Sequence, residues 1–130
     1  MPKFKVYKPT SKFQKYTIPE SIASKEQFML SSSTAGVRYT VPIGFTLFIE
    51  SVHLHVQTTT AAAILVTSSI ECSLAIPTST LTQIDIRTDS INNAADNIIT
   101  YTTPIKLTNG MTITLIVGGG TLTHFDLFGF

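Results

Sequence analysis

Three histidines are the residues of this chain with the most distinctive chemistry. His53 and His55 lie two positions apart in an alternating apolar segment, so both side chains point from the same face of a strand. With His124 they could bind a divalent metal ion through three imidazoles, as catalytic zinc sites do. The other interpretation places the pair on a solvated strand face, opposite the apolar residues of the same segment, which are Val52, Leu54 and Val56. We favour that second interpretation and predict no metal site.

Two further groups of residues could carry chemistry. Cys72 is the only cysteine, so no disulfide can form within the chain and no oxidising compartment is needed. Beside a histidine it could act as a nucleophile. In a strand, however, its side chain would point to the same face as those of Ile70, Leu74 and Ile76, which indicates a small core residue. The run Gly118–Thr121 lacks the lysine and the following helix of a phosphate-binding loop, so we predict a tight turn there.

A polar segment rich in Asn and Asp spans residues 88–97. The carboxylates of Asp85, Asp89 and Asp96 could coordinate Ca²⁺ together with amide oxygens nearby, which belong to Asn92, Asn93 and Asn97. The spacing does not match an EF-hand loop. We favour a solvated loop that, with residues 58–63, contacts partners, and we predict no catalytic residue, no cofactor and no enzymatic activity.

The charge of the chain is divided between two parts. Residues 1–25 carry six lysines and one glutamate, a net charge of +5, and the remainder carries three basic and seven acidic residues, a net charge of −4. Lysines mixed with aromatic residues could bind single-stranded nucleic acid. We favour an arm that docks on a neighbouring protein subunit, with its aromatic residues as anchors and its lysines against acidic groups. The residues expected to make this contact are Lys3, Phe4, Lys5, Tyr7, Lys8, Lys12, Phe13, Lys15 and Tyr16.

The overall numbers exclude several classes of protein. A net charge of +1 argues against nucleic-acid binding by the domain as a whole. The first residues lack the apolar core of a secretory signal, and the longest apolar run, 61–66, is too short to span a bilayer. We therefore expect neither secretion nor contact with a membrane.

Short alternating segments separated by turn residues dominate the chain after the basic part. We predict strands over 37–41, 45–57, 64–76 (as two segments), 81–87, 98–103, 104–107, 111–117 and 121–130, and a short helix over 20–30. In 45–57 the apolar residues change parity between Ile49 and Val52, which predicts a β-bulge near Glu50 and Ser51. The pair Asn109-Gly110 predicts a hairpin turn.

This pattern predicts an all-β protein, a jelly-roll-like antiparallel β-sandwich with an extended basic N-terminal arm. We place the arm at residues 1–30 and the sandwich at residues 31–130. Low charge and many Ser and Thr residues on the strands favour a protein that acts in contact with copies of itself or with partners.

Two segments resemble small β-sandwich structural proteins of tailed phages and other viruses. VPIGFTLFIESVHLHV (41–56) resembles their opening V-P-x-G-x-x-x-x-I-x-S-V pattern, and TTPIKLTNGMTITLIV (102–117) resembles their closing P-I-x-L-x-x-G-x-x-I-x-L strand pair. The resemblance implies a non-enzymatic virion component assembled in the host cytoplasm, such as a capsid decoration, head-fibre or tail-associated protein. Its implied partners are capsid, portal or tail neighbours and further copies of itself.

Two alternatives remain open beside this expectation. A carbohydrate- or receptor-binding sandwich would need an exposed aromatic platform, for which the body offers only Tyr39, Tyr101 and phenylalanines, because the chain has no Trp. The His-x-His pair also resembles cupins, which are metal-binding jelly rolls. The match departs from their pattern, since Gly44 lies nine residues before His53 and no acid follows His55 closely.

Overall fold

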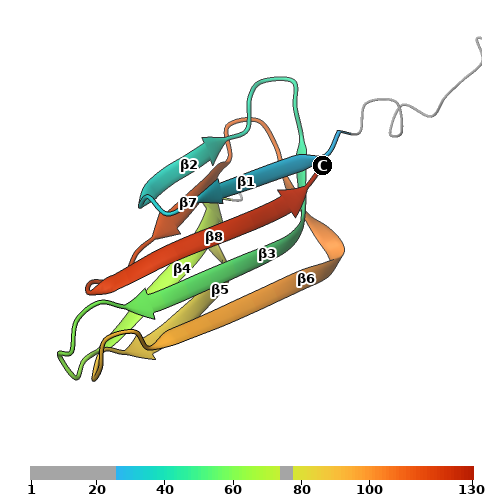
Figure 1. Ribbon diagram of the computed structural model, residues 1–130. Helices are drawn as coiled ribbons and strands as arrows, with labels where there is room; N and C mark the ends of the chain where they lie inside the picture. Colours follow the sequence, from blue (N-terminus) through green and yellow to red (C-terminus); the bar gives the residue numbers. More distant parts are fainter. Residues whose placement is uncertain (1–25, 74–77) are drawn as a thin grey trace, which may run out of the picture.

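The computed structural model describes residues 26–73 and 78–130, and these form two antiparallel sheets that pack face to face (Figure 1). The eight strands are β1 (Phe28–Ser32), β2 (Gly36–Thr40), β3 (Leu47–Thr58), β4 (Leu65–Ser73), β5 (Thr78–Arg87), β6 (Ala94–Leu107), β7 (Thr112–Ile116) and β8 (Thr121–Gly129). Sheet I has the order β1-β8-β3-β6, and sheet II has the order β2-β7-β4-β5. The predicted all-β sandwich is confirmed, whereas the expected arm lies outside the described residues apart from its last few positions.

The strand pairs follow the jelly-roll pattern. Pairing joins β1 to β8, β2 to β7, β3 to β6 and β4 to β5. Each of the first four strands therefore pairs with an antiparallel strand from the last four. The further pairs β3–β8 and β4–β7 complete the two sheets. Two Greek keys folded in this way make an eight-stranded jelly roll.

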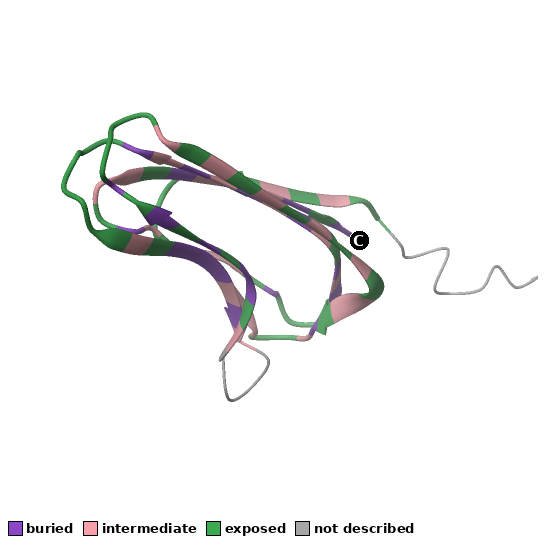
Figure 2. Cartoon of the chain, turned by 90° about the horizontal axis from the view of Figure 1, so that it is seen from below, coloured by how far each residue is buried: buried purple, intermediate pink, exposed green. Residues whose placement is uncertain are grey.

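The core lies between the two sheets and takes alternate residues from their inner faces (Figure 2). Its largest fully buried side chain is Phe125 of β8, which packs with residues of β3 such as Leu54. The remaining core residues are Val41, Leu47, Ile49, Val52, Val56, Ile70, Cys72, Leu81, Ile84, Ile86, Leu107, Ile113, Leu115 and Leu127. Each large apolar side chain removed from water in this way stabilises the fold by about 1.5–3 kcal/mol.

A β-bulge in β3 decides which residues of that strand enter the core. The register of β3 shifts between Ile49 and Ser51 against both of its neighbours, which confirms the predicted bulge. Ile49 before the bulge and Val52 after it are both fully buried, although their parities differ. The same shift leaves the odd-numbered residues after Ser51 on the outer face of sheet I, and His53 is the first of these.

Several local predictions are corrected by the structure. Of the helix expected over 20–30, only residues 26–30 are described, and there the strand β1 begins at Phe28, within the range given to the arm. The segment 64–76 forms the single strand β4 up to Ser73, with a register shift between Ile70 and Glu71, and residues 74–77 lie outside the described part. The segments 98–103 and 104–107, predicted as separate strands, belong to the single strand β6, which contains Pro104. An edge strand tolerates proline because the backbone groups on its outer side need no hydrogen-bond partner.

The turn at Asn109-Gly110 is present but does not make a hairpin. It joins β6 of sheet I to β7 of sheet II, and the amide of Gly110 donates to the Val41 carbonyl oxygen at 2.9 Å. Gly110 has a positive φ of 84°, a conformation that glycine adopts at little cost. Local turn chemistry was therefore predicted correctly, whereas the prediction of which strands it joins was wrong.

Candidate functional site

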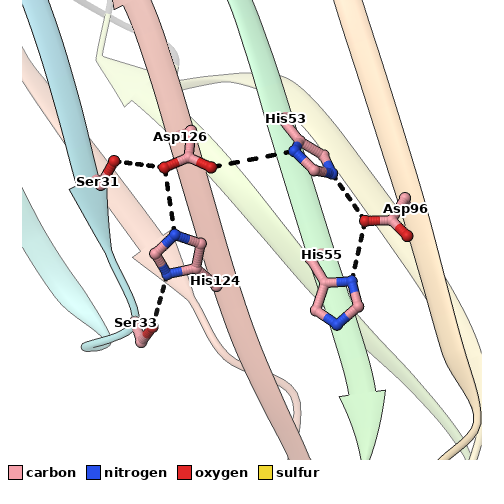
Figure 3. A network of polar contacts seen from close by, with 7 residues as sticks. All are labelled: Ser31, Ser33, His53, His55, Asp96, His124 and Asp126. Carbon is pink, nitrogen blue, oxygen red and sulfur yellow. Dashed lines mark hydrogen bonds and ion pairs between the residues drawn. The ribbon is translucent and has the colours of Figure 1, made fainter.

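The outer face of sheet I carries a network of three histidines, two aspartates and two serines (Figure 3). His53 and His55 come from the central strand β3, His124 and Asp126 from the adjacent β8, and Asp96 from the edge strand β6. In the register, His55 lies opposite Asp96 on one side and His124 on the other. Ionisable residues that are far apart in sequence therefore meet across three neighbouring strands.

Asp96 accepts hydrogen bonds from two imidazoles at a single oxygen. Its Oδ1 lies 2.7 Å from Nε2 of His53 and 2.9 Å from Nδ1 of His55. An ionised carboxylate can only accept, so both ring nitrogens carry the proton in this arrangement. These bonds lower the pKa of Asp96, and the bond from His53 has the larger effect.

Asp126 forms the second centre of the network. Its Oδ1 accepts a short hydrogen bond from the Ser31 hydroxyl and a bond of 3.2 Å from Nε2 of His124. Its other oxygen, Oδ2, lies 4.0 Å from Nδ1 of His53, so this ring stands between the two aspartates. The bond from Ser31 lowers the pKa of Asp126 most, and partial burial acts in the opposite direction. On the far side of His124, Nδ1 accepts from the Ser33 hydroxyl at 2.8 Å.

Exposed apolar side chains surround this network on the same face. Met29 pairs in register with Phe128 and Ile98 pairs with His53, while Leu122 lies opposite Gln57. Met29, Ile98 and Leu122 are each about two-thirds exposed, at 65%, 68% and 64%. A face on which polar groups satisfy one another while large apolar groups stay in water is suited to contact with another macromolecule.

The structure divides the three histidines rather than gathering them. His53 and His55 share Asp96, whereas His124 contacts Asp126 and Ser33. Among the described residues, no three His, Cys, Asp or Glu side chains surround a common point as metal ligands would. The predicted position of the pair on the outer face, opposite the buried Val52, Leu54 and Val56, is confirmed.

The other sequence candidates occupy separate places. Cys72 is buried in the core as predicted, and burial raises the pKa of its thiol. Gly118–Gly120 forms part of the connection between β7 and β8, and the amide of Gly118 is already bonded to the buried Ser68 hydroxyl at 2.9 Å. The predicted turn is confirmed, and this amide is not available to a phosphate.

The three acids considered for Ca²⁺ do not come together. Asp85 accepts a hydrogen bond from the Thr67 hydroxyl on sheet II at 2.6 Å. Asp89 accepts one from the side-chain amide of Asn93 at 3.1 Å, and Asp96 belongs to the outer face of sheet I. The polar loop is shorter than predicted, because β6 already begins at Ala94. Its backbone is tied to the end of β3, where the Thr58 amide donates to the Asn93 carbonyl oxygen at 2.8 Å.

The two tyrosines of the described chain, Tyr39 and Tyr101, pack against other residues rather than form an open platform. Tyr39 meets Phe28 edge to face with ring centroids 4.8 Å apart, and the half-buried Tyr101 donates its hydroxyl to the Leu81 carbonyl oxygen at 3.1 Å. The nine arm residues expected to bind partners all lie outside the described residues. A cleft of about 220 Å³ opens where the described chain begins, lined mainly by aromatic and aliphatic residues that include Phe28, Tyr39 and Phe45.

Sequence reasoning missed Asp96 and Asp126 as partners of the histidines. The spacing of His124 and Asp126, two residues apart, was a signal that they share a strand face. Asp96 gave no such signal, because its position opposite His55 depends on the pairing of β3 with β6.

No family model matches the chain, and no curated protein matches it. The described part of the chain contains no helix long and apolar enough to cross a membrane.

Proposed function

We propose that this protein is a non-enzymatic structural component of a virion, a capsid decoration or a head- or tail-associated subunit, that works through contacts with neighbouring proteins. One observation carries the proposal: an eight-stranded jelly roll whose sheet I presents exposed apolar side chains on its outer face. Jelly rolls are frequent in viral capsid proteins, although the fold alone also serves lectins and cupins. The two segment resemblances point to the same class.

The surface of the sandwich favours contact at more than one place. Besides Met29, Ile98 and Leu122 on sheet I, the loop before β3 exposes Ile43 and Phe45. Burying such side chains against another subunit contributes about 25 cal/mol for each Å² of apolar area removed from water. Separate contact patches allow one subunit to touch more than one neighbour in a symmetric assembly.

Charge supplies a second attraction between copies. The chain after residue 25 has a net charge of −4, and residues 1–25 have a net charge of +5. Opposite charges on two parts of one chain attract parts of different copies as well, and they guide the encounter between them. We therefore expect the basic segment to strengthen assembly and the strength to fall as salt is added.

Solution mass tests the role of the basic segment. We would compare the full chain with a chain that starts at Glu26 and so retains all eight strands. A full chain that forms a defined oligomer, while the shortened chain is a folded monomer, supports assembly through residues 1–25. A full-length control in which Lys3, Lys5, Lys8, Lys12 and Lys15 become Gln separates the charges from the aromatic anchors, which it leaves in place.

Particle composition tests the virion assignment itself. Mass spectrometry on purified particles of the virus that encodes the chain should find it at a fixed copy number after washing at physiological salt, where the charge contacts of the basic segment persist. Its absence from washed particles, together with its presence in infected cells, would remove the virion proposal while leaving the oligomer result intact.

A further inference from the structure

We propose that the cleft at the start of β1 binds an aromatic side chain from residues 1–25 of a second copy of this chain. The inference rests on the proposed assembly through residues 1–25, and it names the surface that receives them. It does not depend on the virion assignment, because it concerns only the contact between two copies.

The cleft combines buried aliphatic residues with aromatic walls. Val41 and Leu47 line it and are almost fully buried. Phe28 and Tyr39 contact each other edge to face along it, with ring centroids 4.8 Å apart. Phe45, on the loop before β3, also lines the cleft and leaves 66% of its surface exposed. An apolar hollow of this kind is the usual receptor for an aromatic anchor at a protein interface.

The volume of the cleft suits one aromatic ring. A cavity of about 150 Å³ lined by aliphatic and aromatic side chains holds a molecule of benzene. The cleft measures about 220 Å³, which gives room for the ring of a phenylalanine or a tyrosine together with its Cβ atom. We therefore infer that one side chain, and not a helix, enters the cleft.

Backbone hydrogen bonds hold the walls of the cleft in place. The Val41 amide donates to the Met111 carbonyl oxygen at 2.9 Å. Phe130, which also lines the cleft, exchanges hydrogen bonds of 2.8 and 3.0 Å with Phe48, and the two rings stack with centroids 5.1 Å apart. Groups that are already fixed lose little freedom when an occupant binds, so the contact is stronger for the same buried area.

Residues 1–25 have the composition that this cleft fits. They contain six lysines and four aromatic residues, each next to a lysine, which are Phe4, Tyr7, Phe13 and Tyr16. Among the described residues that line the cleft, Glu26 is the only charged one. A lysine beside the inserted ring therefore meets a negative charge, which guides the encounter of the two surfaces.

The position of the cleft indicates a second copy as the source of the ring. Glu26 and Phe28 form part of its wall at the start of β1, close to the C-terminus (Figure 1). To enter the cleft, the preceding residues of the same chain would have to reverse direction at that wall, whereas a segment from a neighbour can enter from the solvent side. Tyr16 lies ten residues before Glu26. Ten residues span at most about 33–36 Å, enough to pass from one domain with a radius of gyration of about 13 Å to the next.

Photo-crosslinking of the full chain tests the contact. Photoreactive benzoyl-phenylalanine would replace Phe45 in chains of normal isotope content, which are then unfolded and refolded together with heavy-nitrogen chains that lack it. Mass spectrometry of the crosslinked peptides should find residues 1–25 of heavy chains joined to position 45. Crosslinks to segments of normal isotope content alone would overturn the second copy as the occupant. Crosslinks only to residues outside 1–25 would overturn the basic segment as the occupant.

Phe45→Ala and Leu65→Ala form a matched pair for light scattering on dilution series of the full chain. The two side chains are similarly exposed, at 66% and 60%, but of the two only Phe45 lines the cleft. Phe45→Ala should weaken association by about tenfold or more, and Leu65→Ala should change it by less than about threefold.

The outcomes separate this inference from the proposed assembly. Unchanged association in Phe45→Ala would overturn the cleft as the receptor and leave the assembly intact. A parent chain that is monomeric throughout the dilution series would overturn the assembly and this inference with it. Circular dichroism establishes that each variant is folded.

Discussion

Gly129→Ala should destabilise the protein strongly, although it adds a single methyl group. Gly129 is buried at the end of β8, directly opposite Ile49 at the start of the β3 bulge. A Cβ at this position would overlap the carbonyl oxygen of Phe48 and lie 3.0 Å from its carbonyl carbon and 3.1 Å from Cα of Ile49. These are backbone atoms, so no side chain can swing away to make room, and the two strands must separate.

The size of the effect follows from what that separation disrupts. Phe48 and Phe130 exchange two backbone hydrogen bonds of 2.8 and 3.0 Å beside the contact. Overpacking of a close contact costs about 1–3 kcal/mol, and each lost hydrogen bond costs about 0.5–1.5 kcal/mol. We therefore expect the free energy of unfolding to fall by about 2–6 kcal/mol, a large part of the 5–15 kcal/mol typical of a domain.

Urea unfolding followed by far-ultraviolet circular dichroism measures this loss. With an m value of about 1.5 kcal/mol per M, a loss of about 3 kcal/mol lowers the midpoint by about 2 M. Gly119→Ala is the control, because a Cβ there meets no atom within 4 Å, and its midpoint should stay close to that of the parent chain. Equal midpoints for Gly129→Ala and the parent chain would refute the close approach of the two strands.

Three further predictions concern other residues of the sandwich. The pKa values of Asp96 and Asp126 are lowered in the fold, so their stabilising contribution is present above the ordinary value of 3.8 and is lost as pH falls below it. Urea midpoints of the double Asp→Asn variant and the parent chain should differ at pH 6 and converge near pH 2. Ser68→Ala leaves the buried Gly118 amide without its acceptor and should cost about 1–3 kcal/mol, measured in the same assay. Because Cys72 is buried and its thiol pKa is raised, a disulfide reagent at pH 8 should label it slowly until urea unfolds the chain; rapid labelling of folded protein would contradict its place in the core.

The features that depend on the alternation of side chains between the two faces of one strand were predictable from the sequence. The change of parity between Ile49 and Val52 predicted the bulge, and the bulge put His53 and His55 on the outer face. Strand alternation is a local property of the backbone, so a single sequence carries it. The same holds for Cys72, which is buried on the same face as Ile70, two residues before it.

The parts that depend on pairing between distant strands were not predictable. Asn109-Gly110 forms a turn whose flanking strands belong to different sheets, and no local feature distinguishes that case from a hairpin. The segment from Phe28 to Leu30 was expected to be helical, but it pairs with β8 near the other end of the sequence. The partners of the histidines were missed for the same reason, since Asp96 reaches His55 only through the register of β3 with β6.

The bulge links the stability of the sandwich to the chemistry of its outer face. A regular β3 in which Leu47 and Ile49 kept their inward positions would also turn His53 and His55 inward, and would expose Val52 and Leu54. Burying two imidazoles without their aspartate partners would cost several kcal/mol, and exposing two aliphatic residues would remove their contribution to the core. The core and the polar network therefore select the same register of β3. For that reason we expect Gly129→Ala, which disturbs the strand opposite the bulge, to weaken both the fold and the hydrogen bonds that His53 and His55 make to Asp96.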